Sequence, residues 1–200
     1  EGTAWQWTWF VPHDVDGLVE LMGGRDAFIG KLDSLFVADS SLEGESVSVD
    51  ISGLIGQYAH GNEPSHHIAH LYNYVGQPYK TQALVDSVLH TLYFNNPDGL
   101  SGNEDCGQMS AWYILNAMGF YQVCPGKPVY SIGRPLFNEA TVHLKDGKSF
   151  KVIAHNNSRD NKYVRSIVLN GNKLETPFFT HQDIVDGGTL ELTMGSEPLK

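Results

Sequence analysis

Two carboxylates and an amide stand close together in the stretch GNEDCGQMSAW, residues 102–112. Acidic side chains at this place could simply begin a helix, because the first turn carries a partial positive charge that stabilises them. They could instead perform chemistry, because a carboxylate can take a proton from water, and flanking glycines let a reacting group approach the backbone closely. The spacing leaves both interpretations open for Asn103, Glu104 and Asp105.

The cysteine in this stretch raises a second question. Cys106 follows Asp105 directly and could be a nucleophile with a histidine as its base. We expect instead a buried structural thiol near the start of a helix. Cys106 and Cys124 are the two cysteines of the chain, and this count neither shows that they pair nor gives a CxxC metal pattern.

A second group of chemically capable side chains lies in GQYAHGNEPSHHIAH, residues 56–70. His66 and His70 have the i, i+4 spacing with which two imidazoles on a helix bind zinc, but no glutamate stands between them as in the HExxH motif. A hard cation with oxygen ligands, such as Glu63, amide oxygens and backbone carbonyls, fits the loop better. Asn62 or Glu63 could also cap the helix that we expect to follow.

The chain opens with EGTAWQWTWF, in which Trp5, Trp7 and Trp9 alternate with polar residues. Such alternation is typical of a strand with one buried face. The indole rings could also form a platform for a sugar, because aromatic rings stack on the C–H faces of pyranoses. The pattern alone favours the buried strand.

The chain changes character near residue 122. Helical patterns predominate before it, around a polar loop at 38–52, and alternating strands with tight turns predominate after it. We predict helices at 16–22, 26–36, 64–75, 78–94 and 105–118. We predict strands at 140–144, 149–154, 164–169 and 189–194, with hairpin turns at 145–148 and 170–173. The predicted fold is mixed α and β: helical hairpins followed by an antiparallel, sandwich-like β segment.

Composition narrows the function classes. The formal charge of −10 argues against nucleic acid as a partner, because phosphate binding requires a basic surface. No run of about eighteen apolar residues is present, so we expect no membrane span. The sequence opens without an initiator Met and at full aromatic density, from which we expect a piece of a longer protein.

Three long motifs, in order, carry a resemblance to a known family: EGTAWQWTWFVPHDV, GQYAHGNEPSHHIAHLYNYVGQP and GLSGNEDCGQMSAWYILNAMGFYQVCPG. Together they resemble the calcium-dependent exo-α-mannosidases of glycoside hydrolase family 92, and YSIGRPLF at 130–137 and the Asn170-Gly171 turn agree. The resemblance covers essentially the whole chain but only the last part of such enzymes, which consist of a β-sandwich and an (α/α)6 barrel. It implies that residues 1–122 are the C-terminal part of the barrel and residues 123–200 a closing antiparallel β segment.

The resemblance also implies a mechanism. Inverting glycosidases use one carboxylic acid to protonate the leaving oxygen and a second carboxylate to activate water, the two typically about 6.5–9.5 Å apart. In the family's pattern the acid is the glutamate that opens EGxxWQ, here Glu1, and the base comes from the loop that matches residues 102–105, where we expect Asp105. Many relatives carry an acid where this chain has Asn103, which can orient a water but cannot deprotonate it. Glu104 is then expected to be a structural or capping residue.

The same resemblance implies a calcium ion that holds the O2 and O3 hydroxyls of the mannose and helps to distort the ring. The candidate ligands are Glu63 and Gln57, with Asn62 and a backbone carbonyl as lesser ones. His66 and His67 would contact the sugar or the residues behind it. Trp5 would form a wall of the sugar site.

The implied substrate is a terminal α-linked mannose of a mannose-rich glycan such as an N-glycan, and the implied location is outside the cytoplasm. Members specific for α-1,2 linkages carry a His-Glu pair just before the glutamine, where this chain has Gly53 and Leu54, which weakens that assignment. A second hypothesis is a non-catalytic carbohydrate-binding or assembly fragment, because part of a barrel cannot enclose a substrate. Such a fragment would expose apolar helix faces and could associate with the missing N-terminal part or with another copy. A third hypothesis is a zinc-dependent hydrolase that uses His66 and His70.

Overall fold

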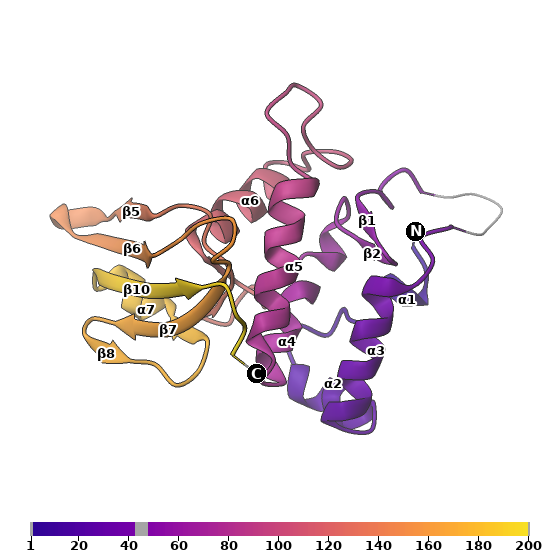
Figure 1. Cartoon of the computed structure of the whole chain (residues 1–200). Coiled ribbons are helices and arrows are strands. Elements are labelled where there is room, and N and C mark those ends of the chain that lie inside the picture. Colours follow the sequence, from indigo (N-terminus) through magenta and orange to yellow (C-terminus); the bar gives the residue numbers. More distant parts are fainter. Residues whose placement is uncertain (1, 43–47, 200) are drawn as a thin grey trace.

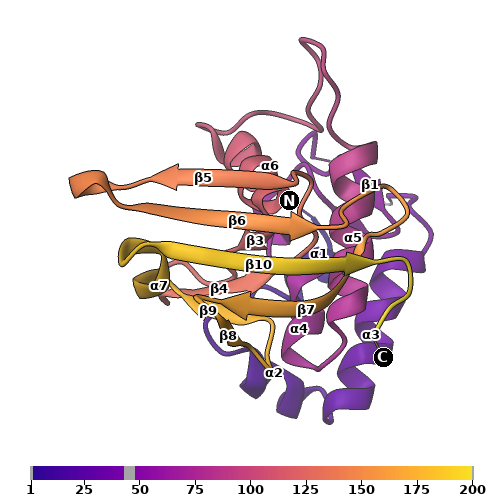
Figure 2. The same ribbon diagram turned by 60° about the vertical axis from the view of Figure 1, so that its left-hand side comes forward.

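The computed structural model describes residues 2–42 and 48–199. Helices gather in the first part of the chain and strands in the second, and the two parts pack side by side (Figure 1, Figure 2). Helix α5 (Pro78–Thr91) stands between them. In Figure 1 the larger sheet lies to its left, and α1 (Ala4–Trp7), α2 (Val15–Leu21) and α3 (Arg25–Val37) lie to its right. The fold is mixed α and β, as predicted.

Three of the predicted helices are confirmed with small shifts of their ends: α2, α3 and α5. Asp14 precedes α2, and its side chain accepts a hydrogen bond from the backbone N–H of Gly17 at 3.0 Å, which caps the helix. Pro78 begins α5, where its fixed φ suits the first turn. The remaining α-helices are α4 (Leu71–Tyr74), α6 (Gln108–Met118) and α7 (His181–Val185).

The prediction of one continuous helix over 64–75 is wrong. The chain instead makes two 3-10 turns, η1 (Glu63–Ser65) and η2 (Ile68–His70), before α4 begins. The His66 N–H bonds to the Glu63 carbonyl and the His70 N–H to the His67 carbonyl, each at 3.0 Å. The histidines of this segment are buried and bonded to other parts of the chain. These tertiary hydrogen bonds replace a regular α-helical path.

Helix α6 was predicted to begin at residue 105 but begins at Gln108. Asp105, Cys106 and Gly107 have φ angles of 50°, 57° and 92°, in the left-handed region that a right-handed helix cannot include. The predicted end is confirmed, because Gly119 adopts φ 103° as the C-cap.

The three N-terminal tryptophans do not lie on a strand. Thr3 and Gln6 form a capping box, in which the backbone N–H of Thr3 donates to Oε1 of Gln6 at 2.7 Å, and α1 follows. A helical turn sends the rings in different directions. Trp9 is fully buried, Trp5 is half-buried and Trp7 is 41% exposed. The buried-strand interpretation is therefore wrong for this segment.

The second part of the chain contains two sheets. The five-stranded sheet has the order β5-β6-β10-β7-β8, and the three-stranded sheet has the order β3-β4-β9. The strands of the larger sheet are β5 (Glu139–His143), β6 (Ser149–His155), β7 (Tyr163–Leu169), β8 (Asn172–Lys173) and β10 (Gly188–Gly195). Those of the smaller sheet are β3 (Phe120–Tyr121), β4 (Val129–Ile132) and β9 (Phe178–Thr180). A hairpin of β1 (Leu54–Ile55) and β2 (Tyr58–Ala59) lies apart in the helical region.

Both predicted hairpins are confirmed. β5 pairs with β6 and β7 with β8, each antiparallel. The β7–β8 turn holds Asn170 at φ 50° and Gly171 at φ 79°, the two positive angles that a type I′ turn requires. The predicted antiparallel pairing is confirmed for β5 with β6, β7 with β8 and β10 with β7, whereas β10 pairs with β6 in parallel. β10 reaches that position only after the chain has passed through β7, β8, β9 and α7.

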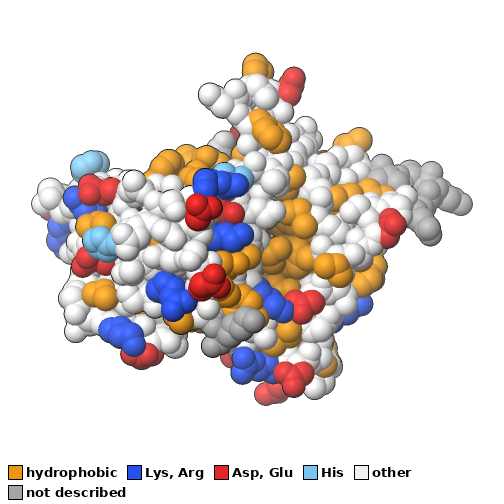
Figure 3. Space-filling view, viewed as in Figure 1, with side chains coloured by type: hydrophobic (Ala, Val, Ile, Leu, Met, Phe, Trp, Pro, Cys, Tyr) orange, Lys and Arg blue, Asp and Glu red, His pale blue; other side chains and the backbone are white. Residues whose placement is uncertain are grey.

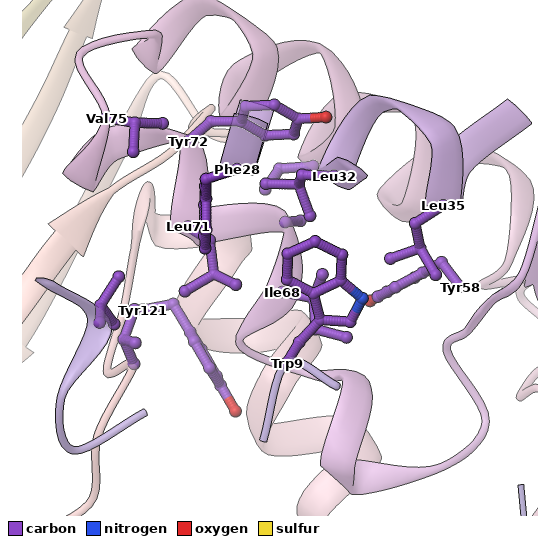
Figure 4. Close-up of a cluster of buried hydrophobic side chains, with 14 of the residues drawn as sticks. Trp9, Phe28, Leu32, Leu35, Tyr58, Ile68, Leu71, Tyr72, Val75 and Tyr121 are labelled. Carbon is purple, nitrogen blue, oxygen red and sulfur yellow. The ribbon is translucent and has the colours of Figure 1, made fainter. Parts of the chain in front are cut away.

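Each part has its own apolar core. Phe28, Leu32 and Leu35 lie on one face of α3, and they pack around Trp9 with every one of these side chains 0% exposed (Figure 4). Burying a side chain of this size contributes about 1.5–3 kcal/mol. The β part is centred on three phenylalanines, with Phe179 stacked on Phe150 at 5.8 Å between ring centroids and edge-on to Phe120 at 5.3 Å.

Buried polar contacts join the two parts. The His70 ring lies 3.0 Å from Ser131 Oγ on β4, and Nδ2 of Asn73 donates to the same oxygen at 2.7 Å. Nearby, Nε of Arg134 lies 3.0 Å from Oδ1 of Asp86 on α5, and both side chains are buried. Removing one partner of a buried ion pair typically costs about 3–5 kcal/mol, so these contacts fix how the sheet sits against α5.

Apolar side chains remain on the surface of the helical part. The face in Figure 3 carries a hydrophobic area beside the sheet, whereas charged side chains are scattered over the sheet itself. Leu21, Val37 and Ile114 are 85%, 82% and 54% exposed, each on or at a helix. Within residues 2–42 and 48–199, no helix has both the length and the apolar character of a membrane span.

Candidate active site

The N-terminal segment and the 56–70 segment are joined by buried hydrogen bonds. Gln6 is 2% exposed, and its Nε2 donates to the backbone oxygen of Gln57 at 2.8 Å and to Oε1 of Gln57 at 3.1 Å. Further along, the ring Nε2 of His67 lies 2.7 Å from the backbone oxygen of Trp9. A carbonyl oxygen only accepts, so this nitrogen carries the ring proton. The first and second motifs therefore form one structural unit.

Glycines bring the 102–105 loop against the same unit. A Cβ atom on Gly61 would lie 2.0 Å from Ser52 Oγ and 2.9 Å from the backbone oxygen of Ser101. A Cβ atom on Gly102, whose φ is 77°, would lie 3.3 Å from the backbone oxygen of Gly61. Side chains at these positions would hold the two segments apart. The structure thus places the third motif in direct contact with the second.

The candidate base lies in a strained turn. Asp105 and Cys106 are consecutive residues in the left-handed region, a conformation that costs of the order of 1–3 kcal/mol for each residue and is concentrated at functional sites. The Asp105 side chain is exposed, and its carboxylate makes no hydrogen bond or ion pair within the part of the chain that the structure describes. Asn103 is also exposed. Both roles assigned from the sequence stay predictions.

Glu104 has the capping role that was expected of it. Its Oε1 accepts the backbone N–H of Ser110 at 3.0 Å, and its Oε2 accepts the Ser110 hydroxyl at 2.8 Å. Ser110 lies in the first turn of α6, whose N–H groups have no partner inside the helix. Glu104 is therefore bonded at the start of α6, whereas the Asp105 carboxylate has no partner among the described residues.

The expectation for Cys106 is wrong. The thiol is exposed and not buried, because the left-handed turn precedes the helix and directs the side chain away from the core. Cys124 is also a free cysteine, so the two do not form a disulfide.

The candidate calcium ligands are oxygen donors held in place by the fold. Gln57 is 5% exposed, and its Nε2 donates to the backbone oxygens of Ser41 (3.1 Å) and Asp39. Its Oε1 accepts one bond from Gln6 and retains a second acceptor site. Asn62 is buried, with 7% exposure.

Glu63 supplies the one carboxylate of this donor set. It is half-buried at the start of η1, and its carboxylate has no hydrogen bond or ion pair with residues 2–42 or 48–199. Among the same residues, no three or more His, Cys, Asp or Glu side chains are grouped to hold a metal. A cation at this place would rely on one carboxylate together with amide and backbone oxygens. That set suits calcium, which binds hard oxygen ligands, and does not suit zinc.

The histidines that suggested zinc have other partners. The Nε2 of His66 lies 2.9 Å from the backbone oxygen of His60, and its Nδ1 lies 3.0 Å from Nε2 of Gln108. The two ring nitrogens of His70 lie 3.0 Å from Ser131 Oγ and 2.9 Å from Asn116 Oδ1. All four nitrogens are thus engaged, and the broken helix does not align the two rings as an α-helix would. The zinc hypothesis is not supported.

Burial keeps these imidazoles neutral. Desolvation lowers the pKa of His66 to about 4 and also lowers the pKa of His67, even though backbone hydrogen bonds oppose the shift in both. Both nitrogens of the neutral His66 ring are bonded to protein atoms, so the ring holds the His60 backbone and the Gln108 side chain in place. Whether His67 or Trp5 contacts a sugar stays a prediction. One face of the Trp5 ring is covered by Lys31 Nζ, 3.9 Å from its centroid.

Four further residues of the site were missed in the sequence: Gln6, His60, Gln108 and Tyr121. Gln6 had a signal, because Thr3-Ala4-Trp5-Gln6 has the T-x-x-Q spacing of a capping box. His60 is fully buried, with its ring nitrogens 2.8 Å from Tyr58 Oη and 2.7 Å from Tyr93 Oη. Gln108 and Tyr121 carry no local signal in the sequence. Nε2 of Gln108 bonds to both His66 and Tyr121, and these contacts join segments that are distant in the sequence.

A pH dependence of stability follows from His70. Desolvation lowers its pKa from about 6.5 to about 4, against the opposing effect of the hydrogen bond that its Nε2 donates to Oδ1 of Asn116. Between these values the unfolded chain binds a proton that the folded chain does not. The free energy of unfolding should therefore fall as the pH falls from 6.5 to 4, by on the order of 3 kcal/mol from this residue.

The measurement is denaturant unfolding at a series of pH values, with a His70→Gln variant as the comparison. Between pH 6.5 and pH 4, the free energy of unfolding of the variant should depend less steeply on pH, by the contribution of one proton. An unchanged slope, or a His70 imidazole that titrates above pH 6 by NMR, would contradict the assignment.

The remaining candidate, Glu1, lies outside the described residues. It precedes Gly2 and the Thr3 cap of α1, whose Gln6 is bonded to Gln57.

Comparisons with known proteins agree with this geometry. The sequence model of the glycosyl hydrolase family 92 catalytic domain matches residues 1–196. A protein of Arthroderma benhamiae described as an uncharacterized secreted glycosidase is 31% identical over 98% of this chain and 24% of its own length. A family GH92 alpha-mannosidase of Bacteroides thetaiotaomicron in complex with mannoimidazole superposes with a TM-score of 0.92 at 43% identity, over 100% of this chain and 26% of its own. A family GH92 inverting mannosidase of the same organism gives a TM-score of 0.85 at 45% identity, over 99% of this chain and 28% of its own.

The chain thus spans about a quarter of the length of these relatives. The family match extends over nearly all of its residues, including the three motif segments that meet in the structure. The chain belongs to the catalytic domain of glycosyl hydrolase family 92.

Proposed function

We propose that this chain is the C-terminal part of an inverting, calcium-dependent exo-α-mannosidase that removes terminal α-linked mannose from glycans. The observation that carries the proposal is the meeting of the three motif segments, through Gln6 with Gln57 and through Gly61 with Gly102. Such a meeting is expected where an acid, a base and a sugar-binding loop must surround one bond. Two solved relatives at 43% and 45% identity are described as mannosidases, one of them as inverting.

In the proposed reaction Asp105 takes a proton from a water molecule on the face of the ring opposite the leaving group. The water oxygen attacks C1, the glycosidic bond breaks, and Glu1 gives its proton to the departing oxygen. Asn103 orients the water through its amide. The exposed carboxylate of Asp105, which has no partner among residues 2–42 and 48–199, is suited to this task, whereas Glu104 is occupied at the start of α6.

Glu63, Gln57 and Asn62 would hold the calcium ion, which when bound would supply a positive charge that fixes the O2 and O3 hydroxyls of the mannose. Gln6 orients the Gln57 amide for this task, since it donates to Gln57 Oε1 while two backbone oxygens hold Gln57 Nε2.

The Gly53–Leu54 segment lies next to the loop at 102–105, which carries the proposed base Asp105 and is called the base loop below. A Cβ atom on Gly53 would meet Ser101 Oγ at 2.7 Å, so a larger residue there would displace the loop.

The rest of the enzyme would surround this unit. We propose that helices of an (α/α)6 barrel, contributed by chain outside residues 1–200, cover the exposed apolar side chains such as Leu21, Val37 and Ile114. A location outside the cytoplasm is proposed because the Arthroderma relative is described as secreted. The second candidate, a binding or assembly fragment, rests on the same exposed faces. Titration of the 200-residue chain with mannobiose separates the two, because a binding module would bind without turnover.

Calcium dependence gives the test of this proposal. We expect EDTA to abolish hydrolysis of an α-mannoside by the intact enzyme, and calcium but not magnesium to restore it, because magnesium demands a smaller octahedral site. Glu63→Gln removes the one carboxylate of the donor set, and the calcium concentration for half-maximal activity should rise at least about tenfold, which corresponds to about 1.4 kcal/mol.

The matched control is Glu20→Gln, an exposed glutamate on α2 that is not one of the candidate calcium ligands. It should leave the calcium response unchanged. Full activity in EDTA, or an unaltered calcium response in Glu63→Gln, would show that the ligand assignment is wrong.

A further inference from the structure

The Gln108 side chain joins the base loop to the segment at 56–70, which is called the histidine segment here. Gln108 is the first residue of α6, and its backbone N–H donates to the carbonyl of Asp105 at 3.1 Å. Its side-chain Nε2 donates to Nδ1 of His66 at 3.0 Å and to Oη of Tyr121 at 3.2 Å. Gln108 therefore contacts Asp105, the residue proposed as base, and two side chains from other segments, those of His66 and Tyr121.

The direction of these bonds follows from their partners. The backbone oxygen of His60 only accepts, so the proton of the His66 ring is on Nε2, 2.9 Å away. Nδ1 of His66 is then an acceptor, and only a hydrogen-bond donor can pair with it. The amide of Gln108 supplies that group and gives its second N–H to Tyr121. A carboxylate or an apolar side chain at position 108 could not make the bond to His66.

His66 is itself fixed between the motif segments. Its backbone N–H donates to the Glu63 carbonyl at 3.0 Å, and its backbone oxygen accepts from Nε1 of Trp112 on α6 at 2.9 Å. Its side chain is 2% exposed. His66 thus offers Gln108 a rigid anchor, joined directly to the residue proposed as the calcium-binding carboxylate.

The base loop needs such an anchor. Asp105 and Cys106 hold two consecutive left-handed angles, a conformation that persists only where surrounding contacts determine it. On the helix side, Glu104 bonds to Ser110, but this contact lies within the loop and the helix that follows it. Gln108 links this turn to His66 by a side-chain hydrogen bond, in addition to the backbone approach of Gly102 to Gly61.

We propose that Gln108 is a positioning residue, which sets the place of the Asp105 carboxylate relative to the calcium ligands by tying the base loop to His66. This inference rests on the proposed function. The hydrogen bonds of the Gln108 side chain go to His66 and Tyr121 and not to the candidate calcium ligands, so its effect should appear in the chemical step and not in binding.

The test is Gln108→Met in the intact enzyme, a change that keeps the length of the side chain and removes both donors. We expect kcat on an aryl α-mannoside to fall about 10–100-fold, because a displacement of about 1 Å can cost 10²-fold. KM and the half-saturating calcium concentration should stay within about twofold of the wild type, the pattern of a lost transition-state contribution. Gln108→Glu, which has the shape of glutamine but cannot donate to His66, should show the same loss.

The matched control is Gln122→Met. Gln122 is also half-buried, and its Nε2 donates to the backbone oxygens of Cys124 at 3.3 Å and Lys127 at 3.4 Å, away from the base loop. It should keep wild-type kcat. A second arm combines Gln108→Met with Asp105→Asn; if Gln108 acts through Asp105, the double variant should be no slower than Asp105→Asn alone.

Three outcomes would overturn the positioning role: wild-type kcat in both Gln108 variants, a loss that matches a smaller folded fraction, or the full loss on the Asp105→Asn background. If Asp105→Asn abolishes turnover while both Gln108 variants are active, the proposed function stands and only this inference fails. If Asp105→Asn keeps wild-type turnover, the proposed base is wrong and this inference fails with it.

Discussion

Asp105→Asn should lower kcat of the intact enzyme by about 10²–10⁴-fold, whichever leaving group the α-mannoside carries. An amide has the shape of the carboxylate but cannot take a proton from water, and the attack of water is needed for every substrate of an inverting enzyme. The exposed Asp105 carboxylate makes no bond to the described part of the chain, so the change removes no structural contact there. The measurement is kcat on an aryl mannoside and on mannobiose, with calcium saturating.

Two variants of neighbouring acids serve as controls. Asp98→Asn changes an exposed acid in the same α5–α6 connection and should leave kcat unchanged. Glu104→Gln keeps an oxygen that can accept the Ser110 N–H, so it should weaken the cap with a smaller effect on kcat. Wild-type activity in Asp105→Asn, or a larger loss in Glu104→Gln than in Asp105→Asn, would mean that the base has been assigned to the wrong residue.

Glu1→Gln should show the opposite dependence on the leaving group. The proposed task of Glu1 is to protonate the departing oxygen, which a sugar alkoxide needs and a weakly basic aryloxide hardly needs. Turnover of mannobiose should therefore fall about 10²–10⁴-fold, and turnover of a dinitrophenyl mannoside far less.

The contrast between the two variants is the sharper result. Asp105→Asn should affect both substrates alike, and Glu1→Gln only the one with the poor leaving group. Equal losses on both substrates in Glu1→Gln, or no loss on either, would exclude Glu1 as the general acid.

The sequence predicted those elements whose pattern is local. The α3 helix follows from the spacing of Phe28, Leu32 and Leu35 on one face, and the β7–β8 hairpin follows from Asn170-Gly171. The two 3-10 turns at 63–70 could not be predicted in this way. They depend on where the buried histidines find partners, and those partners lie far away in the sequence.

The same distinction applies to the site. The family resemblance singled out Asp105, Glu63 and Gln57, and the expectation that Glu104 is a structural or capping residue is confirmed. The contact between the loops could not be read from them, because it depends on the absence of side chains at Gly61 and Gly102. The exposure of Cys106 was missed for a related reason. Nothing in its sequence neighbourhood predicts two successive left-handed residues without glycine.

Asp105 is proposed to activate water and not to attack the sugar itself. The most direct measurement is the anomeric form of the first product, followed by proton NMR while the intact enzyme hydrolyses an α-mannoside. A single displacement by water predicts β-mannose as the first signal, with α-mannose growing in later by mutarotation. If α-mannose is formed first, the reaction retains configuration through a covalent intermediate, and the role proposed for Asp105 is contradicted.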